Sequence, residues 1–100
     1  MPLYLVHATD NAGSAEIRAR ALDEHVTYLQ SRAEIVLAGA ALTDDGETAH
    51  GSVFIVNVPD RAGAEAFSNG DPFTRDGVFN AVNITRVRKG IWQPEAADRA

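Results

Sequence analysis

Six patterned segments in the order strand, helix, strand, strand, helix, strand predict an α+β fold for this chain of 100 residues. The helical segments repeat apolar residues at helical spacing, and the other four are short apolar runs bounded by turn residues. This order is typical of a ferredoxin-like sandwich, in which two helices cover one face of a four-stranded antiparallel sheet. The length predicts a single domain over residues 1–100, with a tail from about residue 91.

The composition is that of a folded protein without covalent cross-links. Hydrophobic residues make up 45% of the chain and charged residues 23%, which favours a globular domain over a disordered chain. The absence of cysteine excludes disulfides, thiolate catalysis and cysteine metal sites. The formal net charge of -5 disfavours nucleic acid and anionic membranes as partners, because both need a positive field. With no signal-peptide pattern and no long apolar run, we expect a soluble, cytoplasmic protein.

The first strand and the first helix are predicted in the N-terminal third of the chain. Leu3 to Thr9 is an apolar run ended by the turn residues Asp10 to Gly13. Ser14 is a candidate helix cap, and good helix formers continue to Arg32. The apolar residues of this helix share one side, namely Ile17, Ala21, Leu22, Tyr28 and Leu29. His25 falls near the middle of that side, so its imidazole needs a buried hydrogen-bond partner.

The middle of the chain predicts an antiparallel hairpin. Glu34 to Leu42 and Gly51 to Val58 are nearly continuous apolar runs, joined by a polar loop with an Asp-Gly turn. Gly39 and Gly51 lie in these runs, where glycine often marks a bulge or the close approach of another group. Because both runs are apolar at consecutive positions, both faces of the sheet are expected to be covered. Helices can cover one face, and a second copy of the chain is expected on the other.

A short helix, a last strand and a tail complete the predicted order. Asp60 is a candidate cap for the second helix, whose apolar stripe comprises Ala62, Ala66 and Phe67. Ala81 to Lys89 predicts a last strand near a sheet edge. The basic run at residues 86–89 is interpreted as a charged edge that blocks strand pairing, rather than as a nucleic-acid site. Trp92 is the apolar anchor of the tail and is expected to dock, with a subunit boundary as one candidate place.

The stretch from residue 68 to residue 79 reads as neither helix nor strand and carries the first functional candidate. Pro72 fixes its own φ and pushes Asp71 toward extended geometry, so Asp71 is expected on a stiff bend. The flanking rings of Phe73 and Phe79 can anchor this segment in apolar surface while it presents a carboxylate. The alternative is that Asp71 is only a turn residue, or the cap of a short helical turn beginning at Pro72.

The second functional candidate is His25. If Asp71 reaches it, the carboxylate fixes the imidazole tautomer and makes His25 a general acid or base near neutral pH. The alternative is a core histidine bonded to a backbone carbonyl or a hydroxyl group. A triad with Ser52 is disfavoured, because no nucleophile-elbow motif is present. His7, His25 and His50 share no short metal-ligand spacing, so no metal site is predicted.

Several motifs in combination resemble the YCII-related (YciI-like) proteins. They are Arg20 to Leu29, Ala38-Gly39, Gly51-Ser52, Asp71-Pro72-Phe73 and Gly77-Val78-Phe79. The resemblance covers the chain to about Lys89. It implies a ferredoxin-like fold that assembles as a homodimer of the dimeric α/β-barrel type.

The resemblance also implies a chemistry. In that family the helix histidine and the aspartate of the Asp-Pro-aromatic motif form a candidate catalytic pair, which corresponds to His25 as acid or base and Asp71 as its orienter. Some relatives are cofactor-free dehydrochlorinases of chlorinated hydroxyquinols. We therefore expect a lyase or isomerase that needs no cofactor or metal and acts on a small cyclic or carbonyl-containing molecule, with Gly39, Ser52 and Phe73 lining its pocket. The alternative is a non-catalytic ligand-binding or protein-interaction domain, in which the histidine and aspartate form a buried polar tie.

Overall fold

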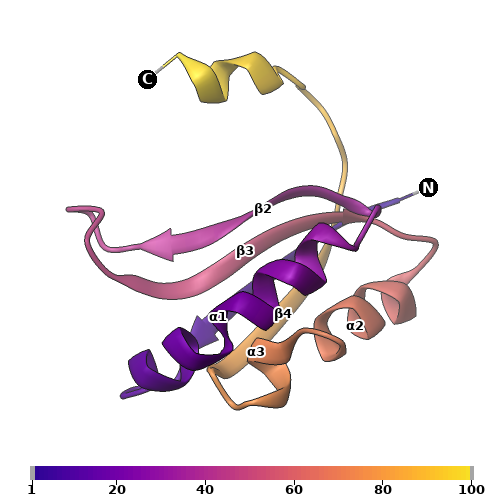
Figure 1. The fold of residues 1–100 in the computed structure, drawn as a ribbon. Helices are drawn as coiled ribbons and strands as arrows, with labels where there is room; N and C mark the ends of the chain where they lie inside the picture. Colours follow the sequence, from indigo (N-terminus) through magenta and orange to yellow (C-terminus); the bar gives the residue numbers. More distant parts are fainter. Residues whose placement is uncertain (1, 100) are drawn as a thin grey trace.

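The computed structural model describes residues 2–99 and contains one four-stranded antiparallel sheet with its α-helices on one face (Figure 1). The strands are β1 (Leu3–Asp10), β2 (Ile35–Leu42), β3 (Ala49–Asn57) and β4 (Phe79–Val87). The helices are α1 (Ala15–Gln30), α2 (Arg61–Asn69), the four-residue α3 (Pro72–Arg75) and a 3₁₀ helix (Pro94–Asp98). The sheet order β2-β3-β1-β4 confirms the predicted ferredoxin-like fold. The end residues of the predicted domain, 1 and 100, lie outside the described part.

The core lies between the helices and one face of the sheet. Alternate residues of the two central strands point toward the helices and are buried, namely Tyr4, Val6 and Ala8 in β1 and Ser52, Phe54 and Val56 in β3. Helix α2 adds Ala64 and Phe67 to the same cluster. A second, smaller cluster joins Ala21 of α1 to Phe73 in α3 and to Val78, which follows the turn after α3. This second cluster brings the predicted functional stretch against α1.

None of residues 2–99 covers the other face of the sheet (Figure 1). Because side chains alternate along a strand, Leu5, Val53 and Ile55 point away from the helices at its centre. Leu37 on β2 is paired with Ile55 and is 55% exposed. We define Leu5, Leu37, Val53 and Ile55 as the open face. Among the described residues the α-helices cover only one side of the sheet, and the expected cover of the other side by a second copy stays a prediction.

The tail does not dock on the domain that it follows. Figure 1 shows it leading away from the sheet to a 3₁₀ helix that stands apart from the other elements. Ile91 is 84% exposed and Trp92 52% exposed, so the expectation that Trp92 docks is wrong within one chain. Its indole ring lies 5.8 Å from the Lys89 ammonium, which is a surface contact. Docking across a subunit boundary stays a prediction.

Two of the predicted local signals differ in the structure. Ser14 stands at the start of α1, but its side chain makes no capping hydrogen bond, and its carbonyl accepts the Arg18 N–H at 2.9 Å. Asp60 does cap α2, because its carboxylate accepts the Gly63 N–H at 2.9 Å. The stretch at residues 68–79 was predicted to be irregular, yet it ends α2, forms α3 and begins β4, since the Asp71 carboxylate nucleates a helical turn there.

No helix within residues 2–99 combines the length and the apolar character that a membrane crossing requires.

Gly51 lies where β3 passes closest to β1. A Cβ at this position would stand 2.4 Å from the Ala8 carbonyl oxygen, which confirms the predicted close approach, whereas a Cβ at Gly39 would meet nothing within 4 Å. We expect Gly51→Ala to lower the free energy of unfolding by about 1–3 kcal/mol, because β1 must shift to make room. Gly39→Ala should change it by less than about 0.5 kcal/mol. Urea unfolding of both variants measures the difference, and equal effects would contradict this account.

Candidate active site

His25 and Asp71 meet inside the domain. Nδ1 of His25 lies 2.7 Å from Oδ1 of Asp71, and the two residues are 7% and 1% exposed. The partner of the buried imidazole is therefore a carboxylate, and not the backbone carbonyl or hydroxyl of the alternative interpretation. Because an ionised carboxylate only accepts hydrogen bonds, Nδ1 is the donor in this contact, which corresponds to the tautomer whose Nε2 presents a lone pair.

The bend at Asp71 follows from its neighbours in sequence. Asp71 has extended backbone geometry, with φ of -71° and ψ of 127°, and Pro72 opens α3 directly after it. Oδ1 of Asp71 also accepts the Phe73 N–H at 2.9 Å. The helix-cap interpretation and the histidine-partner interpretation thus both describe this residue, and the same oxygen serves both contacts. Oδ2 is buried without a hydrogen-bond partner in the described part of the chain, so these two donors hold the carboxylate.

The ring of Phe73 packs face to face against the imidazole of His25. Its ring is fully buried and stacks on His25, with 3.7 Å between ring centroids and 2° between ring planes. Phe54 meets the same imidazole in an edge arrangement at 6.4 Å. The expectation that Phe73 lines the pocket does not fit this position, because a ring with no exposed surface has none to offer a ligand. Phe73 instead fixes the plane of the histidine ring.

Tyr28, one turn after His25 in α1, bonds to the backbone shortly before the bend at Asp71. Its hydroxyl donates to the Phe67 carbonyl at 2.7 Å, at the end of α2. Burial raises the pKa of the Tyr28 hydroxyl above its ordinary value, against a smaller opposing effect of Arg32, so the hydroxyl keeps its proton and stays a donor. A Cβ on Gly70 would lie 2.6 Å from the hydroxyl oxygen. Glycine at position 70 therefore makes room for the tyrosine hydroxyl.

A cavity of about 200 Å³ opens between α1 and the sheet beside His25. Helix α1 lines it with Arg18, Leu22, His25, Val26 and Leu29, and the sheet lines it with Ala38, Gly39, Ala40, Ser52 and Phe54. Gly39 and Ser52 therefore border the same space as His25. Nε2 of His25 makes no hydrogen bond to any of residues 2–99 and is not among their buried unpaired atoms. The imidazole can meet a ligand through this nitrogen.

Arg18 is a charged residue at this cavity that the sequence patterns did not indicate. Its Nε donates to Asp10 at 2.9 Å, and its Nη2 donates to the Gly51 carbonyl at 2.8 Å and to Ser52 Oγ at 3.2 Å. Because Ser52 is engaged by Arg18 and not by His25, the serine triad does not form. Arg18 precedes His25 by seven residues, which is two helical turns, so a helical wheel that included charged residues could have found it.

A wider hollow adjoins the cavity at the start of α1. It measures about 640 Å³ and is lined by residues 10–15, by residues 47–50 of the hairpin loop, and by Arg18, Ala19 and Leu22. Arg18 and Leu22 line both spaces. The guanidinium of Arg18 thus borders the His25 cavity as well as the broader opening beside it.

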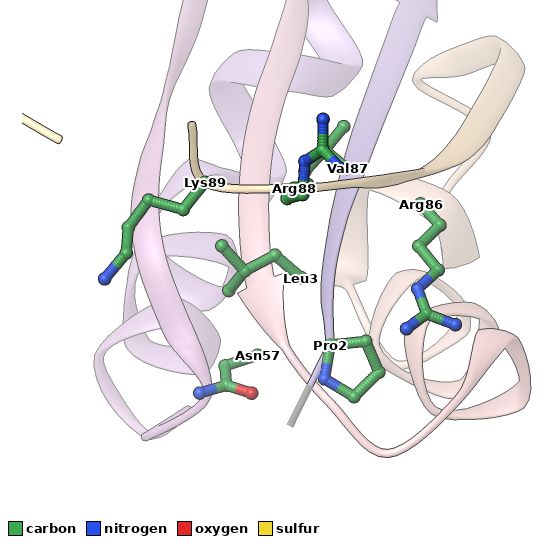
Figure 2. A pocket seen from close by; sticks show the side chains of 7 residues that line it. All are labelled: Pro2, Leu3, Asn57, Arg86, Val87, Arg88 and Lys89. Carbon is green, nitrogen blue, oxygen red and sulfur yellow. The ribbon is translucent and has the colours of Figure 1, made fainter. Parts of the chain in front are cut away.

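Another hollow, of about 530 Å³, lies where β1 begins and β4 ends (Figure 2). It is lined by Pro2, Leu3, Asn57 and the basic run at residues 86–89. Figure 2 shows the side chains of Arg86 and Lys89 lying on opposite sides of the hollow. Because the cations do not converge, they fit the predicted charged edge on β4, which is an edge strand.

In the described part of the chain no group of three or more histidine, aspartate or glutamate residues is placed to hold a metal ion.

Comparison with known proteins places this architecture in a family. The model of the YCII-related domain matches residues 2–88. No curated protein matches the chain. The solved structure of 5-chloro-2-hydroxyhydroquinone dehydrochlorinase (TftG) from Burkholderia phenoliruptrix AC1100, in complex with 2,5-dihydroxybenzoquinone, is 29% identical with a TM-score of 0.80. That match covers 88% of this chain and 95% of the dehydrochlorinase.

Two more distant structures share the fold alone. PA3566 from Pseudomonas aeruginosa is 23% identical with a TM-score of 0.51, over 86% of this chain and 91% of its own. An antibiotic biosynthesis monooxygenase is 15% identical with a TM-score of 0.54, over 88% of this chain and 97% of its own.

Proposed function

Because this chain belongs to the YCII-related family, we propose that it is a cofactor-free enzyme in which His25 and Asp71 transfer protons to and from a small cyclic or carbonyl-containing molecule. The observation that carries the proposal is the 2.7 Å contact between His25 Nδ1 and Asp71 Oδ1 at the wall of a cavity. The Asp71 carboxylate accepts a hydrogen bond from the Nδ1–H group of His25, and Nε2 accepts or delivers the proton of the reaction. The stacked ring of Phe73 keeps the imidazole in one orientation.

The likeness to the dehydrochlorinase supports elimination as the reaction class. In such a step a hydroxylated, chlorinated ring loses two hydroxyl protons and gains one proton at the carbon that bears chlorine. Chloride leaves with its bonding electrons, so HCl is lost and the ring becomes a quinone without an external oxidant. A cavity of about 200 Å³ has room for one such ring, since a cavity of ~150 Å³ accommodates benzene.

Chloride release tests this proposal. The purified chain is incubated with 5-chloro-2-hydroxyhydroquinone, and chloride is measured by ion chromatography while the quinone is followed by its absorbance. We expect release faster than in buffer alone. A chain that binds 2,5-dihydroxybenzoquinone but accelerates no elimination or isomerisation of related rings would favour the alternative, a non-catalytic ligand-binding domain.

We also propose that the chain is a homodimer that buries the open face. This face carries four aliphatic side chains, and no described segment of the chain covers it. Apolar surface of this kind is typical of an interface, because leaving it in water is unfavourable. A second copy related by a two-fold axis would bring the same surface to meet it.

Leu37→Lys is expected to convert the dimer to a monomer. Leu37 is already 55% exposed within one chain, so lysine should leave the monomer folded, whereas a dimer would have to bury the new charge. Sedimentation velocity at micromolar concentration measures the change, and Glu65→Lys on the exposed surface of α2 is the matched control. A wild-type chain that sediments as a monomer under these conditions would contradict the proposed dimer.

A further inference from the structure

We propose that Arg18 and Ser52 bind an anionic oxygen of the ligand, so that the substrate is a small ring bearing a phenolate or enolate. This inference rests on the proposed function for the identity of the reacting ring, but it concerns binding and can be tested without turnover. Neither the sequence motifs nor the contact between His25 and Asp71 assigns a role to Arg18. The argument depends on how its guanidinium is held and which of its donors remain.

The guanidinium of Arg18 is held in place before any ligand arrives. Its contacts to Asp10 at the end of β1, and to the Gly51 carbonyl and Ser52 Oγ in β3, come from two neighbouring strands, and its side chain is 16% exposed. Asp10 makes a second, weak contact, with Oδ1 3.5 Å from Nη2. A group that is already ordered loses little conformational entropy when it binds a ligand. Arg18 is therefore preorganised at the border of the cavity.

Donors remain on this guanidinium. Arginine has five N–H donors, and the contacts to Asp10, Gly51 and Ser52 use those of Nε and Nη2. Nη1 makes no hydrogen bond to any of the residues described. Since Arg18 lines both the His25 cavity and the adjoining hollow, two N–H groups are left to bind an oxygen there. Charged hydrogen bonds of this kind suit an anionic oxygen better than a neutral one.

Ser52 supplies another donor beside it. The Ser52 hydroxyl accepts from Arg18, so that bond leaves its own hydrogen unused. Ser52 is 2% exposed and lines the cavity, which places this hydrogen at the cavity wall or next to it. Accepting a hydrogen bond from a cation polarises a hydroxyl and makes it a stronger donor. Arg18 and Ser52 thus offer neighbouring donors, the Nη1 hydrogens and the hydroxyl hydrogen.

Arg18 and His25 both lie against the ring of Phe73. His25 stacks on Phe73 at 3.7 Å, and the guanidinium carbon of Arg18 lies 4.8 Å from the centroid of that ring. Both residues also line the cavity of about 200 Å³, so a one-ring ligand held there by Arg18 lies in the space that His25 borders. As a proton leaves the ligand, negative charge grows on that oxygen, and fixed donors stabilise it at the point where it develops.

The test compares two ring ligands that differ in charge. 2,5-Dihydroxybenzoquinone carries ionisable hydroxyl groups, and 2,5-dimethoxybenzoquinone is its uncharged counterpart. We expect Ser52→Ala and Arg18→Lys each to weaken binding of the dihydroxy ring by about 10- to 100-fold, while binding of the dimethoxy ring changes by less than about 2-fold. Arg20→Lys, on the exposed side of α1, is the matched control and should change neither. Calorimetric titration gives the affinities, and thermal unfolding confirms that each variant is folded.

The outcomes separate this proposal from the proposed function. We call the proposed binding of an anionic oxygen by Arg18 and Ser52 the oxygen anchor. Equal losses for the two rings, unchanged affinity of both variants, or failure of the wild-type chain to bind the dihydroxy ring would each overturn it. Selectivity for the dihydroxy ring that depends on Arg18 and Ser52, in a chain without turnover, would support the anchor and reject the acid–base enzyme. Turnover that depends on His25 but not on Arg18 or Ser52 would do the opposite.

Discussion

Replacing His25 with asparagine is expected to lower turnover by about 10²- to 10⁴-fold, the usual contribution of a general acid or base. Asparagine keeps a polar side chain beside Asp71 but has no group that exchanges a proton near neutral pH. Affinity for 2,5-dihydroxybenzoquinone should stay within a few-fold, because the imidazole is only one of ten residues that line the cavity. Steady-state kinetics and calorimetric titration measure the two quantities separately. Parallel losses of turnover and affinity would indicate that His25 binds the ligand and does not transfer its proton.

Replacing Asp71 with asparagine is expected to lower turnover by a similar factor, about 10²- to 10⁴-fold. The amide group can offer a donor to Nδ1, which moves the imidazole proton to Nε2 and removes the lone pair from the cavity. The fold should persist, since asparagine matches aspartate in shape, although an amide nitrogen that takes the place of Oδ1 beside Nδ1 no longer accepts the Phe73 N–H. The loss should appear in kcat more than in KM, because Asp71 is buried and acts through His25.

Asp23→Asn gives the matched control for the Asp71 variant. Asp23 is an exposed residue of α1, so its replacement makes the same change in charge without touching the cavity. Comparable activity in the Asp23 and Asp71 variants would show that the carboxylate of Asp71 serves the fold and not the reaction.

The candidate pair was accessible from sequence because each member has a local signal. Pro72 and the acid before it specify a bend, and the helical wheel puts His25 on the inward side of α1. Their contact was not accessible from spacing, since it joins residues 46 apart in the chain. It depends on how α3 packs against α1, and the family resemblance supplied what local patterns lacked.

Phe73 shows how a motif can name a residue without giving its position. The sequence indicated an aromatic ring beside the acid, and a pocket wall was one place for it. In the structure the short helix α3 places this ring against the imidazole of His25, where the ring is fully buried. Trp92 shows the converse, because the pattern identified an apolar anchor but the described chain provides no surface for it.

Arg18 was missed because its role is set by three contacts from distant segments. Its partners are the end of β1 and the start of β3, which approach only when the sheet is assembled. A pattern of apolar residues has no place for an arginine on the inward side of a helix. Such a residue is informative for that reason, since an ordered cation at a cavity needs either a structural partner or a ligand.

The most direct test of the central claim, that His25 oriented by Asp71 exchanges protons with a ligand in the cavity, is nitrogen-15 NMR of the imidazole ring. Spectra are recorded under alkaline conditions that leave imidazoles neutral, before and after 2,5-dihydroxybenzoquinone is added. We predict a proton on Nδ1, a bare Nε2, and a change on ligand addition that is largest at Nε2. A proton on Nε2, or ring signals that the bound ligand leaves unchanged, would contradict the account.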